Sequence, residues 1–284
     1  FLENYNKLQE LLSSGQNDTD LDEQDRMQLD VTNLFDMTDE DFQKTYLNFN
    51  VTEEEIVEAQ SPTDDSFAAE IAENGRHLQS IPNNYDWRTK GVVTSVKHQG
   101  SCGSCYAFAA AGNIESLYAI KYGTLLNLSE QQIVNCDTNQ SGCNGGHIGT
   151  VYNYIIKAGG LGLENYMPYV SRKGTCTSIQ PYAKVKGKKF AGSINEDYIQ
   201  SFLIKYGPLA AAVNANLFKY YKGGVFRYSA ELCNPYNLNH AVVIVGYGVT
   251  TSQLLGTCWD EKGFMRIGRG VCGINRYIVT GIIE

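Results

Sequence analysis

The sequence predicts an α+β protein in which a helical lobe is followed by a β lobe, with a shorter helical segment in front of both. Helical signals dominate from about Cys105 to Ala158, whereas apolar runs typical of strands dominate from Pro208 to Gly246. The composition also changes at Ile81, beyond which all eight cysteines lie and glycine and aromatic residues are more frequent. Because two lobes of different architecture meet along a cleft, we expect the functional site there.

The two parts of the chain differ sharply in charge. Residues 1–80 contain 20 Asp and Glu against 4 Lys and Arg, a net charge of −16, whereas residues 81–284 contain 11 against 19, a net charge of +8. Such complementarity would hold an acidic segment partly against a basic body. A solvated acidic tail has the same composition, so charge alone leaves both interpretations open. We expect two units, residues 1–80 and residues 81–284.

Glycosylation acceptors and the number of cysteines favour the secretory pathway. The chain begins at Phe1, contains no run of 18 apolar residues and shows no basic leader followed by an apolar stretch. We therefore expect a processed form that neither spans a membrane nor retains a signal peptide. Four Asn-x-Ser/Thr acceptors begin at Asn17, Asn50, Asn127 and Asn139. Together with the eight cysteines they favour a lysosomal or secreted protein.

Local signals predict three helices in the first 80 residues. An apolar stripe at helical spacing is formed by Phe1, Tyr5, Leu8 and Leu12. Two capping boxes then predict helix starts, namely Thr38 with Asp41 before a helix through Tyr46, and Thr52 with Glu55 before a helix through about Ala59. Residues 61–80 are polar without strong periodicity, which indicates a linker where cleavage would occur.

The larger domain is expected to begin with helices and to end with strands. The helices are expected at Cys105–Tyr122, after Ser129 with Gln132 in the capping-box position, and around Thr150–Ala158. The strands are expected at Pro208–Val213, Gly224–Tyr228 and His240–Gly246.

The run QGSCGSC, from Gln99 to Cys105, is the most informative stretch of the sequence. A thiol at a helix N-terminus feels the positive end of the helix dipole and unpaired N–H groups, which favour the thiolate. Cys102 and Cys105 also have C-x-x-C spacing, which redox dithiols and half zinc sites share. No second C-x-x-C or H-x-x-x-H pattern completes a metal site, and no βαβ pattern surrounds the pair. We therefore expect neither a metal nor a cofactor.

Five further stretches resemble the papain family of cysteine proteases. The family's mature N-terminus, its cleft-lining segment and the strand that carries its base are matched by IPNNYDWR from Ile81, CNGG from Cys143 and NHAVVIVGYG from Asn239. Parts of its inhibitory propeptide are matched by DMTDEDF from Asp36 and by the first four residues. Because the matches occur in order along nearly the whole chain, the resemblance implies a papain-like two-lobe fold and a cathepsin L-like proenzyme. Residues 1–80 would then be the inhibitory propeptide and linker.

The resemblance also implies the catalytic residues. Cys105 would be the nucleophilic thiolate and His240 its imidazolium partner. The Gln99 side chain, with the N–H of Cys105, would stabilise the oxyanion of the tetrahedral intermediate. Of the remaining histidines, His77 is expected in the linker, His98 beside the nucleophile loop and His147 next to the cleft.

Substrate contacts are implied in the same way. Gly145 and Gly146 would bind substrate as an added strand, because glycine lets a peptide backbone approach closely. The pocket for the side chain two residues before the cleaved bond would be lined by His147, Ile148, Ala212, Leu238, Ala241 and Tyr277. This set predicts an apolar or aromatic preference. No insertion long enough to block the cleft follows Gly146, which favours an endopeptidase.

The family pattern further implies three disulfides and a set of partners. The disulfides would join Cys102 with Cys143, Cys136 with Cys176, and Cys233 with Cys272. Cys105 would stay free as the nucleophile, and Cys258 has no assigned role. The expected partners are peptide or protein substrates, the chain's own propeptide and cystatin-like inhibitors, and the expected state is a monomer without nucleic acid or membrane.

The sequence departs from the family after Gly248. The family has a strand there and then an Asn-Ser-Trp motif, whose Asn orients the histidine. WDEKGFMRI, from Trp259, resembles the stretch after that motif, so about nine residues and a core strand are expected to be missing. Aligning Thr257–Trp259 with the motif instead puts Thr in place of Asn, and Asn275, the only later Asn, follows a disulfide cysteine closely. Two interpretations stay open, an active protease and an impaired homologue that binds peptides or a partner without turnover.

Overall fold

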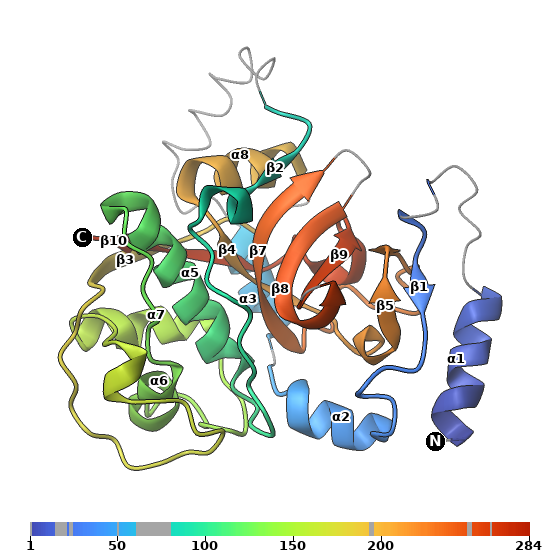
Figure 1. Cartoon of the computed structure of the whole chain (residues 1–284), viewed down its shortest axis with the longest axis horizontal. Helices are drawn as coiled ribbons and strands as arrows, with labels where there is room; N and C mark the ends of the chain where they lie inside the picture. The colour runs from blue at the N-terminus through green and yellow to red at the C-terminus, as the bar shows by residue number, and fades with distance from the viewer. Residues whose placement is uncertain are drawn as a thin grey trace.

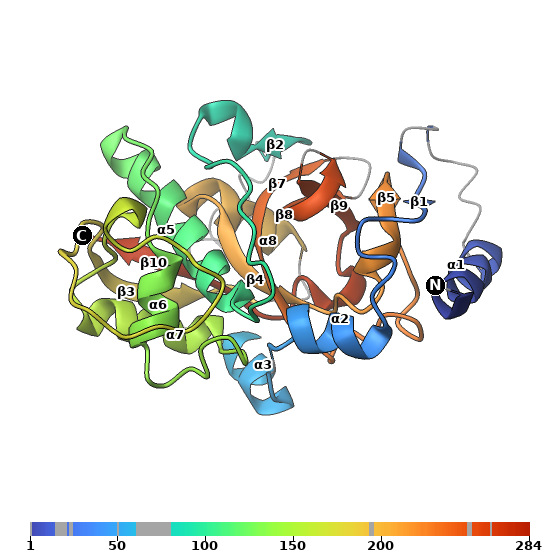
Figure 2. The same cartoon turned by 60° about the horizontal axis from the view of Figure 1, so that its bottom comes forward.

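The helices α5 (Cys105–Tyr122), α6 (Glu130–Cys136) and α7 (Ile148–Lys157) gather at one end of the molecule, and α1 (Leu2–Ser14) lies at the other end (Figures 1 and 2). This computed structural model describes residues 2–14, 22, 25–49, 51–60, 81–192, 196–248, 252–261 and 263–284, without the side chains of residues 53, 58, 60, 196 and 252–261. The expected linker at residues 61–80 and its His77 lie outside the described residues, as do the acceptor residues Asn17 and Asn50.

The helical lobe is built around α5, Cys105–Tyr122, whose bounds are those predicted. Its alanine-rich sequence favours a helix, and Gly123 ends it in the left-handed conformation with φ of 71°. Most of its residues are buried, because it runs between the sheet and two other helices, α6 (Glu130–Cys136) and α7 (Ile148–Lys157). Ser129 caps α6 by accepting a hydrogen bond from the N–H of Gln132, as the sequence predicts.

The main sheet has the strand order β3-β10-β4-β7-β8-β9-β6, and β2 pairs with β7 beside this path. Its strands are β2 (Tyr85–Asp86), β3 (Val185–Phe190), β4 (Leu209–Val213), β6 (Val225–Phe226), β7 (His240–Gly248), β8 (Ser252–Glu261), β9 (Phe264–Gly268) and β10 (Ile278–Ile283). The helix α8 (Glu196–Tyr206) and the strands β3 and β10 were not predicted from the sequence. Short 3-10 turns complete the domain at Trp87–Lys90, Glu164–Tyr166, Phe218–Tyr220 and Val271–Gly273.

The central strands β4 and β7 are buried on both faces. Leu209, Ala211 and Val213 pack into the core of the β lobe, while Ala210 and Ala212 pack into the core of the helical lobe. Side chains alternate between the two faces of a strand, so a continuous apolar run is needed where both faces are covered. The same rule accounts for the run after His240 in β7.

The expected loss of a core strand after Gly248 is wrong. β8 lies between β7 and β9 and pairs antiparallel with both, with Val243 opposite Gly256. The backbone of β7 offers donors and acceptors to β8, and an unpaired edge there would be costly. The deletion relative to the family stays a prediction, since Thr257–Trp259 belong to the strand whose side chains are outside the described set.

The N-terminal segment contains α1 (Leu2–Ser14), β1 (Gln28–Leu29), α2 (Asp39–Tyr46) and α3 (Glu53–Gln60). The predicted capping box at Thr52 is confirmed, and at Thr38 the N-cap half of the predicted box is described. The Thr38 side chain accepts from the N–H of Asp41, and Thr52 and Glu55 bond each other's backbone N–H groups. β1 pairs antiparallel with β5 (Tyr221–Gly223), so this segment adds a strand to the larger domain.

The predicted apolar stripe of α1 is only partly correct. Leu8 and Leu11 are buried, but Tyr5 and Leu12 are 43% and 49% exposed. Asn4 takes a buried place instead, because its amide donates to the carbonyl oxygens of Phe35 and Met37. A polar side chain with such partners can lie on the buried face, which a hydrophobic pattern does not reveal.

Asn113 of α5 joins three elements of the core, α5, α7 and β10, to Pro208, the residue before β4, and gives a stability prediction. Its amide donates to Pro208 O and Thr280 Oγ1, and its carbonyl accepts from Tyr152 Oη and Gly281 N. Replacement by Ala would leave several buried polar groups unpaired, each at about 1–3 kcal/mol, so we expect Asn113→Ala to lower the free energy of unfolding by about 3 kcal/mol or more. Denaturant unfolding of the Cys105→Ser chain measures this.

The matched control for this prediction is Asn153→Ala, at an exposed position of α7. We expect it to change the unfolding free energy by less than about 0.5 kcal/mol. Equal destabilisation by the two substitutions would contradict the assigned role of the Asn113 network.

Candidate active site

Cys105 lies at the first residue of α5, at the boundary between the two lobes. Its thiol is buried and receives hydrogen bonds from backbone groups of Ala241, Tyr106 and Cys105 itself, which favour the thiolate. Burial opposes them and is the larger effect, so the pKa of the thiol is raised to about 11. Among the described residues, Cys105 is the free cysteine.

His240 begins β7 and is 4% exposed. Its Nδ1 lies 3.0 Å from the carbonyl oxygen of Tyr46, in the N-terminal segment. A carbonyl only accepts, so Nδ1 carries the proton in this contact. Burial lowers the pKa of the imidazole to about 4, although the Tyr46 carbonyl acts in the opposite direction.

The structure brings Cys105 and His240 together, because the thiol contacts the backbone of the residue that follows His240. In this buried state both pKa shifts disfavour the charges that the expected thiolate–imidazolium pair requires. With a thiol pKa of about 11 and an imidazole pKa of about 4, both groups are neutral at pH 7. The physical reason is burial, because a charge without water or a paired partner is costly, and the Tyr46 carbonyl lies against His240.

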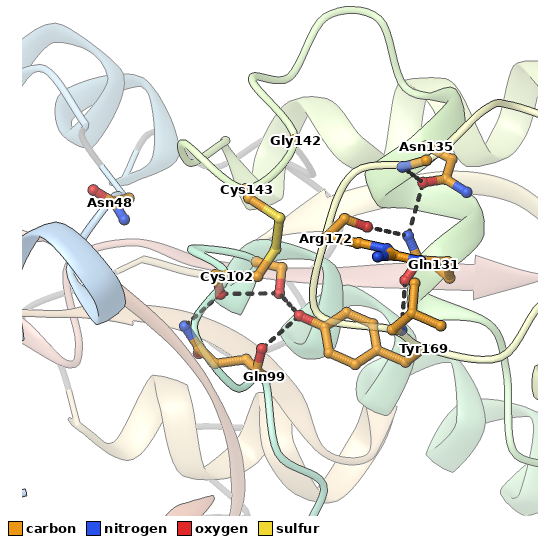
Figure 3. The surroundings of a disulfide bond; sticks show 12 residues. Asn48, Gln99, Cys102, Gln131, Asn135, Gly142, Cys143, Tyr169 and Arg172 are labelled. Carbon is orange, nitrogen blue, oxygen red and sulfur yellow. Dashed lines mark hydrogen bonds between the residues drawn. A yellow bond between two sulfur atoms is a disulfide. The ribbon is translucent and has the colours of Figure 1, made fainter.

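Gln99 and His240 line one cavity of about 100 Å³ beneath the N-terminal segment. His98 also lines this cavity, next to the nucleophile loop as predicted. From the N-terminal segment the cavity is lined by Asn33, Leu34, Phe42, Tyr46 and Leu47. The Gln99 amide donates to Cys102 O at 3.0 Å (Figure 3), which uses one of its two N–H donors.

The loop around Cys102 is cross-linked to the cleft-lining segment. Cys102 is joined to Cys143, and Gly103 N donates to Cys143 O at 2.8 Å. The other two disulfides, Cys136–Cys176 and Cys233–Cys272, are also those expected. Cys258 lies outside the described side chains.

The two cleft glycines have different surroundings. A Cβ built on Gly145, which has φ of 108°, would overlap the carbonyl oxygen of Asn48, so the N-terminal segment approaches as closely as glycine allows. A Cβ on Gly146 would instead meet Gln140 Oε1 and the Tyr106 ring. Gly145 therefore allows a peptide backbone to approach, whereas Gly146 allows side chains from the interior of the helical lobe to pack against it.

Two of the six residues expected to line the substrate pocket, His147 and Tyr277, pack against Phe49 of the N-terminal segment. Phe49 is 2% exposed, and its ring centroid lies 5.5 Å from that of His147 and 6.3 Å from that of Tyr277. The same buried cluster contains Ile148, Ala212, Leu238, Ala241 and Tyr277. An aromatic side chain of the N-terminal segment thus lies between His147 and Tyr277, and the complete pocket stays a prediction.

Lys219 is a site residue that sequence reasoning missed. Its side chain is fully buried and its Nζ donates to Asn4 Oδ1 at 3.0 Å and Met37 O at 3.3 Å, with an ion pair to Asp39. All three partners belong to the N-terminal segment. A buried ammonium requires such partners, so Lys219 ties this segment to the larger domain. The available signal was a lysine inside the apolar run from Leu217 to Tyr221.

The comparisons with known proteins agree with this geometry. Residues 81–282 match the family described as papain family cysteine protease. The chain is 38% identical over 220 residues to cathepsin F of Drosophila melanogaster. This match covers 72% of this chain and 36% of the Drosophila protein. It is 39% identical over 218 residues to the viral cathepsin of Adoxophyes honmai nucleopolyhedrovirus. This match covers 70% of this chain and 61% of the viral protein. The chain thus spans less than two thirds of the length of each of these relatives.

A solved structure extends the similarity to the N-terminal segment. The digestive procathepsin L2 proteinase from Tenebrio molitor larval midgut matches with a TM-score of 0.81 at 28% identity. The match covers 99% of this chain and 89% of that one, so the helices before Ile81 are included in it.

The raised pKa of Cys105 predicts how the intact chain reacts with iodoacetamide. Only the thiolate is alkylated, and below its pKa the thiolate fraction rises about tenfold for each pH unit. We therefore expect the labelling rate of Cys105 to rise steadily from pH 6 to pH 9, measured by mass spectrometry of the labelled peptide. Subtraction of the Cys105→Ser chain corrects for other thiols. A rate that is already constant at pH 6 would contradict the neutral state.

Proposed function

The chain belongs to the papain family of cysteine proteases, and from that premise we propose that it is a cysteine endopeptidase held in proenzyme form. The observation that carries the proposal is the convergence of Cys105, His240 and Gln99 beneath residues 46–49. Residues 1–80 are the inhibitory propeptide and linker, and residues 81–284 are the catalytic domain.

Catalysis begins when the propeptide leaves and water reaches the two buried groups. The Cys105 proton then moves to His240, and the thiolate attacks the carbonyl carbon of a peptide bond. As the C–S bond forms, the carbonyl electron pair moves to oxygen. The Gln99 amide and the Cys105 N–H donate to this oxyanion. The imidazolium gives its proton to the leaving amine, and water hydrolyses the thioester with His240 as base.

The propeptide inhibits because it crosses the site against the direction of a substrate. In a substrate, the residue bound in the predicted pocket precedes the cleaved bond. In the propeptide, Phe49 fills that pocket but follows Tyr46, which lies at His240. The backbone carbonyls are therefore presented to Cys105 in the wrong order for attack.

The pocket that holds Phe49 determines the substrate preference. Its lining is mostly apolar, and it ends at Tyr277, whose ring also packs against Phe190 at 5.7 Å between centroids. Burial of a large apolar side chain there stabilises a complex by about 1.5–3 kcal/mol. Peptides with Phe or Leu two residues before the cleaved bond are the best substrates.

The route of the protein follows from its surface and its cross-links. Three disulfides are present, and the acceptor residues Asn127 and Asn139 are exposed. Such features suit an oxidising secretory compartment, so the enzyme is lysosomal or secreted and acts as a monomer. No helix among the described residues is long and apolar enough to cross a membrane. Cystatin-like inhibitors would compete for the same cleft as the propeptide.

Fluorogenic peptides test the proposed activity directly. After the N-terminal segment is removed by limited proteolysis, we expect hydrolysis of a peptide with Phe in the pocket position and at least about tenfold slower hydrolysis with Asp there. Cys105→Ala should abolish turnover. A wild-type chain that binds these peptides without cleaving them would favour the impaired homologue instead.

The lowered pKa of His240 predicts that acid releases the propeptide. The closed state binds fewer protons than the open one between the ordinary imidazole pKa of about 6.5 and the closed-state value of about 4. As pH falls through that window, the closed state loses stability. The affinity of the segment for the domain then falls by up to about tenfold for each pH unit. The measurement is the affinity of the added segment for an opened Cys105→Ser domain from pH 7 to pH 4.

Two histidine variants separate this effect from other titrating groups. His240→Gln removes the titrating group, so we expect a flatter pH dependence of the affinity. His98→Gln removes a second histidine of the same cavity and leaves the Tyr46 contact in place. Identical slopes for wild type and His240→Gln would show that His240 does not drive release.

A further inference from the structure

The segment that carries Tyr169 is fixed to the helical lobe. Val170 N donates to Gln131 Oε1 at 2.9 Å, and Gln131 Nε2 donates to Arg172 O at 2.9 Å. The same Nε2 donates to Asn135 Oδ1 at 2.7 Å, so the Gln131 amide is itself held in orientation (Figure 3). The Cys136–Cys176 disulfide joins the end of this segment to α6. Tyr169 therefore projects from a rigid support.

The Tyr169 hydroxyl contacts both ends of the nucleophile loop. It lies 2.7 Å from the carbonyl oxygen of Gln99 and 2.6 Å from Oγ of Ser104, the residue before Cys105. Figure 3 shows the Tyr169 hydroxyl directed at the backbone of Gln99. The ring packs edge-on against Phe108, at 4.7 Å between centroids, which keeps the hydroxyl in place.

Counting protons fixes the direction of these hydrogen bonds. The Gln99 carbonyl only accepts, so the single phenolic proton is donated to it. The Ser104 hydroxyl must then donate to the Tyr169 oxygen. Its alternative acceptor, Cys102 O, lies farther away at 3.3 Å. The chain Ser104 to Tyr169 to Gln99 thus spans the loop from its end to its beginning.

We propose that Tyr169 is a positioning residue for the oxyanion site, an inference that rests on the proposed protease function. The two oxyanion donors, the Gln99 amide and the Cys105 N–H, lie at opposite ends of this loop. The loop contains two glycines, Gly100, with φ of 58°, and Gly103. Glycine restricts the backbone little, so the loop is not stiff by itself. The Cys102–Cys143 disulfide holds the middle of the loop, and the Tyr169 hydroxyl holds its ends.

The spacing of the two donors matters because they act on one developing negative charge. A misplacement of about 1 Å can cost about 10²-fold in rate. Without the hydroxyl, Ser104 can turn to Cys102 O, but the Gln99 carbonyl loses its donor. The Gln99 side chain is then free to shift relative to Cys105, while the thiol and His240 keep their places.

Tyr169→Phe tests this role, because the ring and its packing are retained. Each full-length variant is folded and then opened by limited proteolysis of the N-terminal segment. We expect kcat to fall about tenfold or more with KM within about twofold, since the lost interaction acts in the transition state. The affinity for a peptide aldehyde, which forms an oxyanion on Cys105, should fall by a similar factor. Alkylation by iodoacetamide, which forms none, should proceed at the wild-type rate.

Ser104→Ala and Tyr166→Phe complete the comparison. Ser104→Ala removes one bond of the chain but keeps the bond to Gln99, so we expect a smaller loss of kcat than in Tyr169→Phe. Tyr166 is 63% exposed on the same segment, and its hydroxyl should be dispensable. Thermal unfolding of each variant separates a folding defect from a positioning defect, since a folding defect would lower aldehyde binding and alkylation together.

Two results would overturn the inference. If wild type hydrolyses peptides and Tyr169→Phe matches it in kcat and in aldehyde affinity, the positioning role fails and the protease function stands. If Cys105 of the opened wild type neither cleaves peptides nor binds the aldehyde, both proposals fail.

Discussion

The hydrogen bond from His240 Nδ1 to the carbonyl of Tyr46 is the contact on which the state of the whole site depends. It fixes the tautomer of the imidazole and places a backbone peptide over both catalytic groups. Since neither a thiolate nor an imidazolium is stable without water or a charged partner, the covered site is uncharged. In the proposed proenzyme, latency would therefore depend on solvation as well as on blocked access.

This cover can be held in place because two cores meet beneath it. Strands β4 and β7 contribute alternate residues to the cores of both lobes, so a displacement of His240 or Ala241 would disturb both. The N-terminal segment extends the same two cores. Phe42 and Leu47 join the core of the β lobe, and Phe49, Val51 and Ile56 join that of the helical lobe. The segment crosses the cleft as a continuation of the interior.

How much the sequence predicts depends on whether a signal is local. The caps at Thr38 and Ser129 and the start of α5 at Cys105 were predicted, because each depends on a few neighbouring residues. The roles of Asn4 and Lys219 were not predicted, because their partners lie 31 or more residues away and become known only in the fold. Pairing of β8 likewise depends on β7 and β9, which a sequence alignment across a variable stretch does not represent.

The difference in net charge between the N-terminal segment and the larger domain is large, but it contributes little to holding the two together. The described ion pairs between the N-terminal segment and the larger domain are local, Asp39 with Lys219 and Asp25 with Arg266. Many other acidic residues of the segment are exposed, where pairs contribute at most about 1 kcal/mol. Several buried apolar side chains, at about 1.5–3 kcal/mol each, outweigh them. Net charge therefore steers the segment toward the domain, whereas apolar burial and the Lys219 contacts keep it there.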